Sequence, residues 1–200
     1  MKRQLVWLRS DLRLRDNSAL HAAAERGPVI ALYLLSPGQW QRHDDAPSKV
    51  DFWLRNLREL RASLDELHIP LLIRTADLWD EAPKVIAQLC RELDIETLHV
   101  NEEYGVNEAA RDAAVEKALE HDGVRLRSHL DQLFFTPGTI LTKGGTYFQV
   151  YSQFRKVCYE RLNLGVPSLL PAPRAQQRLD IPSDAVPAQV VEERVRCAHG

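Results

Sequence analysis

Cysteine is scarce in this chain, and its spacing gives no sign of a structural role. Three cysteines occur in 200 residues, at Cys90, Cys158 and Cys197. An odd number of widely spaced cysteines favours neither a disulfide framework nor a zinc site. The seven histidines form no HExxH motif and no close pair. We therefore expect no metal site.

Glycine-rich phosphate-binding motifs are also missing. No GxGxxG follows the first apolar segment, and GxxxxGK[ST] does not occur. Binding of a dinucleotide or a triphosphate through a glycine cradle is therefore unsupported. The Gly-x-Ser-x-Gly elbow of many hydrolases is absent as well, which argues against that class of enzyme. Nucleotide binding by another route stays open.

The small net charge gives no sign of a polyanionic partner, and the lack of long apolar runs gives no sign of a membrane-spanning segment. Lys and Arg total 26 against 28 Asp and Glu, a net charge of −2, so strong nucleic-acid binding by this chain is not expected. The apolar runs are much shorter than the roughly 20 residues that span a bilayer. The start, Met1-Lys2-Arg3, leads into a strand and not into a signal peptide. We expect a soluble, cytoplasmic, monomeric protein.

Short apolar runs alternate with amphipathic helical patterns over the first two thirds of the chain. Strands are predicted at residues 5–8, 28–35, 69–74, 97–100 and 124–130, and helices at residues 18–26, 48–67, 78–93 and 108–120. This alternation predicts an α/β fold: a five-stranded parallel, Rossmann-like, doubly wound sheet with helices on both faces.

The alternation stops after residue 130. Residues 131–165 combine an irregular stretch rich in glycine and proline with one more predicted helix, and five of the eleven prolines fall between Pro167 and Pro187. We expect an α/β core in residues 1–130 and an extension of the same domain in residues 131–165. Residues 166–200 are expected to form a proline-rich linker toward a domain that is absent from this chain.

Polar segments follow the first and second predicted strands. Because the carboxyl ends of parallel strands meet at one edge of a sheet, such segments are where α/β folds bind ligands. The charged stretch 9–16 could be a ligand-binding turn or a solvated connection. His43 lies beside Trp40 in the loop 36–48, where it could contact a stacked ligand, although a single loop histidine is more often solvated.

Asn107 and Glu108 follow the fourth predicted strand. A carboxylate next to an amide can bind a flat heterocycle that has adjacent amino and NH groups. The same two residues also suit a helix start, with Asn107 as the N-cap and Glu108 complementing the helix dipole. Spacing alone favours this capping interpretation.

Residues 5–20, LVWLRSDLRLRDNSAL, resemble the opening of the DNA photolyase and cryptochrome family. Further segments resemble successive landmarks of the N-terminal domain of that family, in the same order: LYLLSPGQW, WLRNLREL, IPLLIR, NEEYGVNEAARD and PGTILTKGGTYFQVYSQF. The resemblance covers about residues 3–170. It implies an antenna-binding domain of a bacterial photolyase, followed in the parent protein by a helical FAD-binding domain.

The resemblance also implies a function. Such lyases split cyclobutane pyrimidine dimers in UV-damaged DNA by electron transfer from excited reduced FAD, in the second domain. The chain alone is then expected to be inactive and to hold no catalytic residue. Its expected role is to collect light, and the parent protein would bind DNA only through the absent domain. None of its four tryptophans is expected to belong to the family's electron-transfer chain, and Trp53 is expected to pack in the core.

The antenna that the resemblance implies is 5,10-methenyltetrahydrofolate, which absorbs near-ultraviolet light. His43, Asn107 and Glu108 fall on family positions that contact this folate. Glu108 would pair with the pterin amino and ring NH groups, Asn107 would complete the polar edge, and His43 would border the pocket. A deazaflavin antenna stays open, as do a cryptochrome photoreceptor and a stand-alone nucleotide-binding α/β protein.

Overall fold

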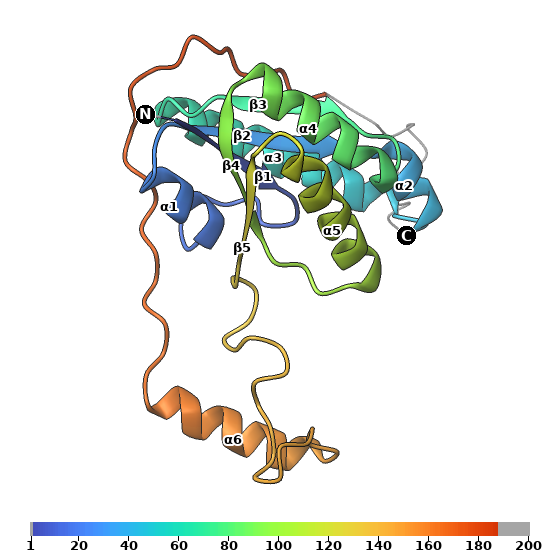
Figure 1. Ribbon diagram of the computed structural model, residues 1–200, viewed down its shortest axis with the longest axis vertical. Helices are drawn as coiled ribbons and strands as arrows, with labels where there is room; N and C mark the ends of the chain where they lie inside the picture. The colour runs from blue at the N-terminus through green and yellow to red at the C-terminus, as the bar shows by residue number, and fades with distance from the viewer. Residues whose placement is uncertain (1, 188–200) are drawn as a thin grey trace, which may run out of the picture.

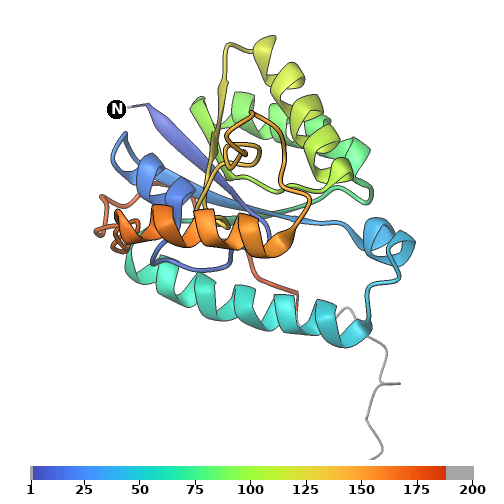
Figure 2. The ribbon, with the colours of Figure 1, turned by 90° about the horizontal axis from the view of Figure 1, so that it is seen from below.

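Every strand of the sheet runs parallel to its neighbours, and helices cover both faces (Figures 1 and 2). The computed structural model describes residues 2–187. The sheet has the order β3-β2-β1-β4-β5, and its strands are β1 (Arg3–Leu8), β2 (Val29–Leu35), β3 (Leu71–Thr75), β4 (Ile95–Asn101) and β5 (Arg125–His129). The predicted doubly wound α/β fold is confirmed.

Two separate hydrophobic cores lie on the two faces of the sheet. The helices are α1 (Ser18–Ala24), α2 (Pro37–Arg42), α3 (Pro47–Glu66), α4 (Ala82–Glu92), α5 (Val106–Glu120) and α6 (Tyr151–Asn163), with a short 3₁₀ helix η1 (Trp79–Glu81). Successive strand residues point to opposite faces, so Leu5 and Trp7 of β1 pack against α4 and α5. Val6 and Leu8 pack against α1 and α3 on the other face.

Some helix starts differ from the sequence predictions, and the region before α3 shows why. The predicted loop 36–48 contains α2, whose six residues are too few to show a helical period. Helix α3 begins at Pro47, one residue before the predicted start, and its N-cap residue Ala46 makes no side-chain capping bond. The physical reason is that a proline in the first helical turn needs no N–H partner and already has the helical φ. By contrast, Asn17 caps α1 by accepting from the backbone N–H of Leu20.

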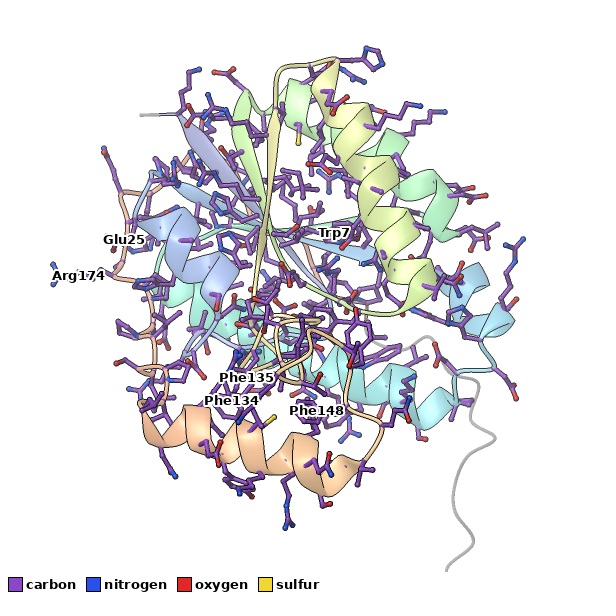
Figure 3. The ribbon with its side chains drawn as sticks, turned by 60° about the horizontal axis from the view of Figure 1, so that its bottom comes forward. Trp7, Glu25, Phe134, Phe135, Phe148 and Arg174 are labelled. Atoms are coloured by element: carbon purple, nitrogen blue, oxygen red, sulfur yellow. The ribbon has the colours of Figure 1, made fainter. Side chains whose placement is uncertain are left out.

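The extension at residues 131–165 extends away from the sheet (Figure 1). Its helix α6 has no buried residue. Within the extension, Arg161 donates to the carbonyl of Thr139 over 3.1 Å, and Figure 3 shows Phe134, Phe135 and Phe148 gathered there. Several apolar side chains are exposed on it, among them Phe134, Tyr147, Val150, Tyr151, Tyr159 and Leu164.

The segment 166–187, called the strap below, runs back along α1 and across to β3 (Figure 1). The Gln176 side chain donates to the carbonyls of Val29 and His68 and accepts from the N–H of Val29, at 2.8–3.0 Å. Farther on, Asp184 accepts from the N–H of Ile73 at the outer edge of β3.

The strap lies in the segment predicted to be a linker, and it packs on the α/β core. Its backbone is extended, but Leu179 and Ile181 pack against one hydrophobic core and Val186 against the other. Residues 188–200, which include Cys197, lie outside the described residues. Within residues 2–187, no helix is both long and apolar enough to cross a membrane.

Removing the Gln176 side chain tests whether the strap stabilises the domain. Gln176→Ala deletes three partly buried hydrogen bonds, each worth about 1 kcal/mol. We expect the free energy of unfolding in urea to fall by about 1–3 kcal/mol. The neighbouring Gln177 is exposed, so Gln177→Ala is the matched control. Equal stability of the two variants would show that the Gln176 side-chain bonds do not stabilise the domain.

A buried histidine makes the stability depend on pH. His99 has no exposed surface, and its ring lies between Gln4 Oε1 at 3.1 Å and His129 Nε2 at 3.0 Å. Burial, reinforced by the positive charges of His129, Arg26 and Arg127, lowers the pKa of His99 to about 3. The unfolded chain, whose His99 has an ordinary pKa near 6.5, binds this proton at much higher pH.

The folded state therefore loses stability as the pH falls from about 6.5 toward 3, by up to about 1.4 kcal/mol per pH unit. In urea unfolding at a series of pH values, His99→Gln should flatten this dependence. His121 is exposed, so His121→Gln should leave it as in the unmodified chain. A His99→Gln profile parallel to that of the unmodified chain would contradict the assignment.

Candidate functional site

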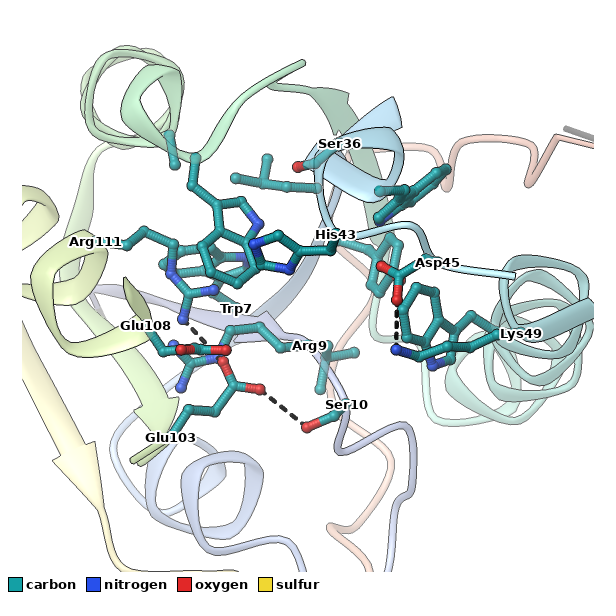
Figure 4. Close-up of a pocket in the computed structure, with 17 residues that line it drawn as sticks. Trp7, Arg9, Ser10, Ser36, His43, Asp45, Lys49, Glu103, Glu108 and Arg111 are labelled. Carbon is teal, nitrogen blue, oxygen red and sulfur yellow. Dashed lines mark hydrogen bonds and ion pairs between the residues drawn. The ribbon is translucent and has the colours of Figure 1, made fainter. Parts of the chain in front are cut away.

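A cavity of about 210 Å³ lies at the carboxyl ends of β1 and β2 (Figure 4). Its walls come from the exits of these strands, from α2 and α3, from η1, and from the segment that leads from β4 into α5. The strand order reverses at β1, which has β2 on one side and β4 on the other. Crevices at this point of a doubly wound sheet are where such folds bind ligands.

All four tryptophans of the chain line the cavity. They are contributed by β1 (Trp7), α2 (Trp40), α3 (Trp53) and η1 (Trp79). The ring centroids of Trp40 and Trp53 are 6.2 Å apart. The expectation that Trp53 packs in the core is wrong: it is only partly buried and belongs to the cavity wall. Its helical period placed it near the apolar face of α3 but could not reveal what it faces.

Arg111 of α5 is held between aromatic rings and carboxylates. Its guanidinium lies 4.8 Å from the ring centroids of both Trp7 and Trp79. It also donates to Glu103 at 2.9 Å and to Asp112 at 2.8 Å. Only 5% of this side chain is exposed. Such a group is fixed in place, because ion pairs and cation–π contacts hold it from different sides.

Arg9, directly after β1, repeats this pattern. It pairs with Asp112 at 2.7 Å and with Glu103 at 3.5 Å. Burial alone would raise the pKa of Glu103, but the charge of Arg9 and hydrogen bonds from Arg111 and Ser10 hold this pKa below its usual range. Two guanidinium groups and two carboxylates therefore compensate one another at this side of the cavity.

Glu108 differs from the other charged residues that line the cavity, because its carboxylate has no hydrogen-bond or ion-pair partner among residues 2–187. Lys49 and Asp45, for comparison, pair with each other at 2.5 Å. The Glu108 side chain folds back over Gly105, where the Cβ of any other residue would collide with its Oε2 atom. Gly105 thus leaves the space that this carboxylate occupies.

The structure brings two of the three predicted site residues to the cavity. His43 and Glu108 both line it, whereas Asn107 is exposed and does not. The His43 ring packs edge-on against Trp79, with centroids 5.1 Å apart, and its Nε2 lies 2.9 Å from Gln39 Nε2. The capping interpretation of Asn107 is wrong, because Gly105 is the N-cap and Asn107 lies inside the first turn of α5.

Sequence reasoning named Arg9 only as part of the charged stretch 9–16 and missed Arg111 and the carboxylates of the site, although a signal for them existed. Arg9 directly follows β1, and Glu103 closely follows the adjacent β4. Arg111 comes three residues after Glu108, the spacing that places two side chains on one helix face. The tryptophans carried no such signal, because they lie on elements far apart in the sequence.

The cavity offers aromatic rings for stacking and an unpaired carboxylate for hydrogen bonding. Aromatic walls with polar groups at set positions are typical of sites that hold flat organic ligands. A carboxylate accepts hydrogen bonds only, so Glu108 favours a ring that donates them. No group of three His, Cys, Asp or Glu side chains in the described part of the chain is placed to hold a metal ion.

Comparisons with known proteins place the chain in a family. The model of the DNA photolyase family matches residues 4–175. A Salmonella typhimurium protein named deoxyribodipyrimidine photo-lyase is 37% identical over 176 residues, which are 87% of this chain and 37% of the relative. An Escherichia coli protein of the same name is 34% identical over 202 residues, covering 100% of this chain and 42% of the relative.

Solved structures agree with this result. A bacterial class III photolyase from Agrobacterium tumefaciens superposes with a TM-score of 0.70 at 28% identity, over 93% of this chain and 37% of its own. A Synechocystis cryptochrome shares the fold, with a TM-score of 0.75 at 22% identity over 92% of this chain and 40% of its own. The chain spans about two fifths of the relatives it matches, and it belongs to the DNA photolyase family.

Proposed function

We propose that this chain is the light-harvesting domain of a deoxyribodipyrimidine photolyase and that its cavity holds the antenna chromophore. Membership of the family and the match to about two fifths of its relatives support this role. In the proposed parent protein, which is cytoplasmic and monomeric, FAD and UV-damaged DNA are bound by the remaining three fifths. The light-driven repair of pyrimidine dimers takes place there.

The exposed apolar surface of the extension supports a second domain in the parent. No residue of α6 is buried, while Tyr151 is 73% and Tyr159 60% exposed. Large exposed apolar patches mark interaction surfaces. We propose that the FAD-binding part of the parent covers them.

The chromophore that we propose is 5,10-methenyltetrahydrofolate, and the unpaired carboxylate of Glu108 is the observation that carries this choice. The pterin ring of a folate has an amino group beside a ring nitrogen, a pattern that one carboxylate can engage with both oxygens. The tryptophans supply flat surfaces for the ring. His43, at the C-terminal end of α2, borders the ligand.

The size of the cavity limits how much of a folate can enter. A volume of about 210 Å³ accommodates a fused ring but not a whole folate with its glutamate tail. We therefore place the pterin ring inside and the tail outside. Asn107 is exposed one residue before Glu108, so its proposed contact is with the part of the ligand nearest the mouth.

In this proposal the protein binds and orients the chromophore and transfers no proton. Transfer of excitation to a flavin depends on a fixed distance and angle, so a rigid pocket is what the protein supplies. The charges within the cluster of Arg9, Arg111, Glu103 and Asp112 already compensate one another, so these four residues need no new partner when the chromophore enters. Glu108 alone among the charged lining residues gains a partner.

Neutralising Glu108 tests the assignment directly. Glu108→Gln should weaken the binding of methenyltetrahydrofolate to the full chain by about 1–3 kcal/mol, the cost of losing a charged hydrogen-bond acceptor. A titration that follows the near-ultraviolet absorption of the folate measures this. Glu116 is exposed on the same helix, so Glu116→Gln is the matched control. Unchanged affinity in Glu108→Gln would refute the assignment.

Gly105→Ala displaces the same carboxylate without removing its charge. The added methyl group occupies the position of Glu108 Oε2, and the flexible side chain must turn away. We expect weaker folate binding by about 1 kcal/mol, toward the lower end of coupling energies for residues in contact. In a Glu108→Gln background the same substitution should have little further effect. Full additivity of the two losses would mean that Gly105 acts independently of Glu108.

A further inference from the structure

We propose that the four tryptophans form a second light-collecting set, which absorbs ultraviolet-B light and passes the excitation to the chromophore in the cavity. This inference rests on the proposed function, because it needs a bound acceptor that absorbs in the near ultraviolet. The domain would then collect light in two bands: the band of the chromophore and the shorter-wavelength band of its tryptophans. The second band overlaps the light that forms pyrimidine dimers.

The distribution of tryptophan in the chain carries the proposal. All four indoles line one cavity, although they come from four different elements between β1 and η1. Only Trp7 also belongs to a hydrophobic core. Trp40, Trp53 and Trp79 are partly exposed and contribute to neither core. Stabilisation of the fold therefore does not account for their gathering at this site.

Distances within the cluster favour efficient transfer of excitation. The rings of Trp40 and Trp53 have centroids 6.2 Å apart, and Trp7 and Trp79 share the guanidinium of Arg111 as a neighbour. A ring bound in the cavity is close to all of them. Dipolar energy transfer falls with the sixth power of distance and needs overlap of donor emission with acceptor absorption. Tryptophan emits in the near ultraviolet, where a methenylfolate absorbs.

The charged groups beside the indoles are paired with one another. Arg111 lies 4.8 Å from the centroids of Trp7 and Trp79 and pairs with Glu103 and Asp112. The Lys49 ammonium lies 4.8 Å from the centroid of Trp53 and pairs with Asp45. Transfer of energy creates no new charge among these paired groups, whereas transfer of an electron would.

The test is the fluorescence excitation spectrum of methenyltetrahydrofolate bound to the full chain. The folate is first brought to saturation, as judged by its near-ultraviolet absorption. Folate emission is recorded while the excitation wavelength is scanned across the red edge of indole absorption. We expect a tryptophan band in this excitation spectrum and a parallel loss of tryptophan emission. Trp40→Phe and Trp53→Phe should each remove about a quarter of this band, since each deletes one of four donors.

Tyr159→Phe, on the exposed surface of α6, is the control and should leave the band unchanged. Bound folate without a tryptophan band, or quenched tryptophan without sensitised folate emission, would overturn the inference. Loss of tryptophan emission, matched by a gain in folate emission over that of directly excited free folate, is measured on the unmodified chain, so the test still holds if a variant fails to fold. Absence of folate binding in the absorption titration would instead contradict the proposed function, and the inference would fall with it.

Discussion

The buried amide of Asn101 is the contact on which the site depends. Its nitrogen donates to Asp11 Oδ2 at 2.6 Å and to Asn17 Oδ1 at 2.9 Å, and its oxygen accepts from the N–H of Ala19 at 2.8 Å. One side chain at the end of β4 thus fixes both the turn after β1 and the start of α1. Because Asp11, Asn17 and Asn101 are at most 5% exposed, breaking one bond leaves buried polar groups without a partner, which is costly.

That network engages much of the charged stretch after β1 in contacts within the protein. Asp11 is used inside the turn, where it also accepts from the N–H of Arg9. Arg9 in turn donates to the carbonyl of Asn101 and pairs with Asp112. The exits of β1 and β4 are therefore locked together, and the cluster of arginines and carboxylates forms over them. Buried ion pairs of this kind fix the relative positions of the groups that they join more reliably than they raise the free energy of unfolding. Here they set the position of the first turn of α5, from which Glu108 reaches the cavity.

Much of the fold could be predicted from the sequence, because apolar runs and helical periods are local signals. The predicted strand 28–35 and the observed β2 (Val29–Leu35) differ by one residue. Prediction is weaker where an element is too short to show a helical period, as in the six residues of α2. At α5 the N-cap is Gly105, although Asn107 is the better capping residue by type. Because Gly105 has no side chain, the Glu108 carboxylate can fold back over it.

The site could be predicted only in part, and the reason is again the range of the interactions. His43 and Glu108 were identified by resemblance, and they do line one cavity. The convergence of four tryptophans, and the bonds that join Gln176 to Val29 across 147 positions, arise only when the chain has folded. No periodicity or spacing encodes such contacts. The same is true of the absence of a partner at Glu108, which becomes visible only when the partners of its neighbours are known.

The most direct test is a crystal structure of the full chain in complex with methenyltetrahydrofolate. We expect the pterin ring inside the cavity lined by the tryptophans, with its amino and ring NH groups within hydrogen-bond distance of the Glu108 carboxylate. A folate bound at another surface, or a ring in the cavity that leaves Glu108 without a partner, would contradict the proposed role of this site.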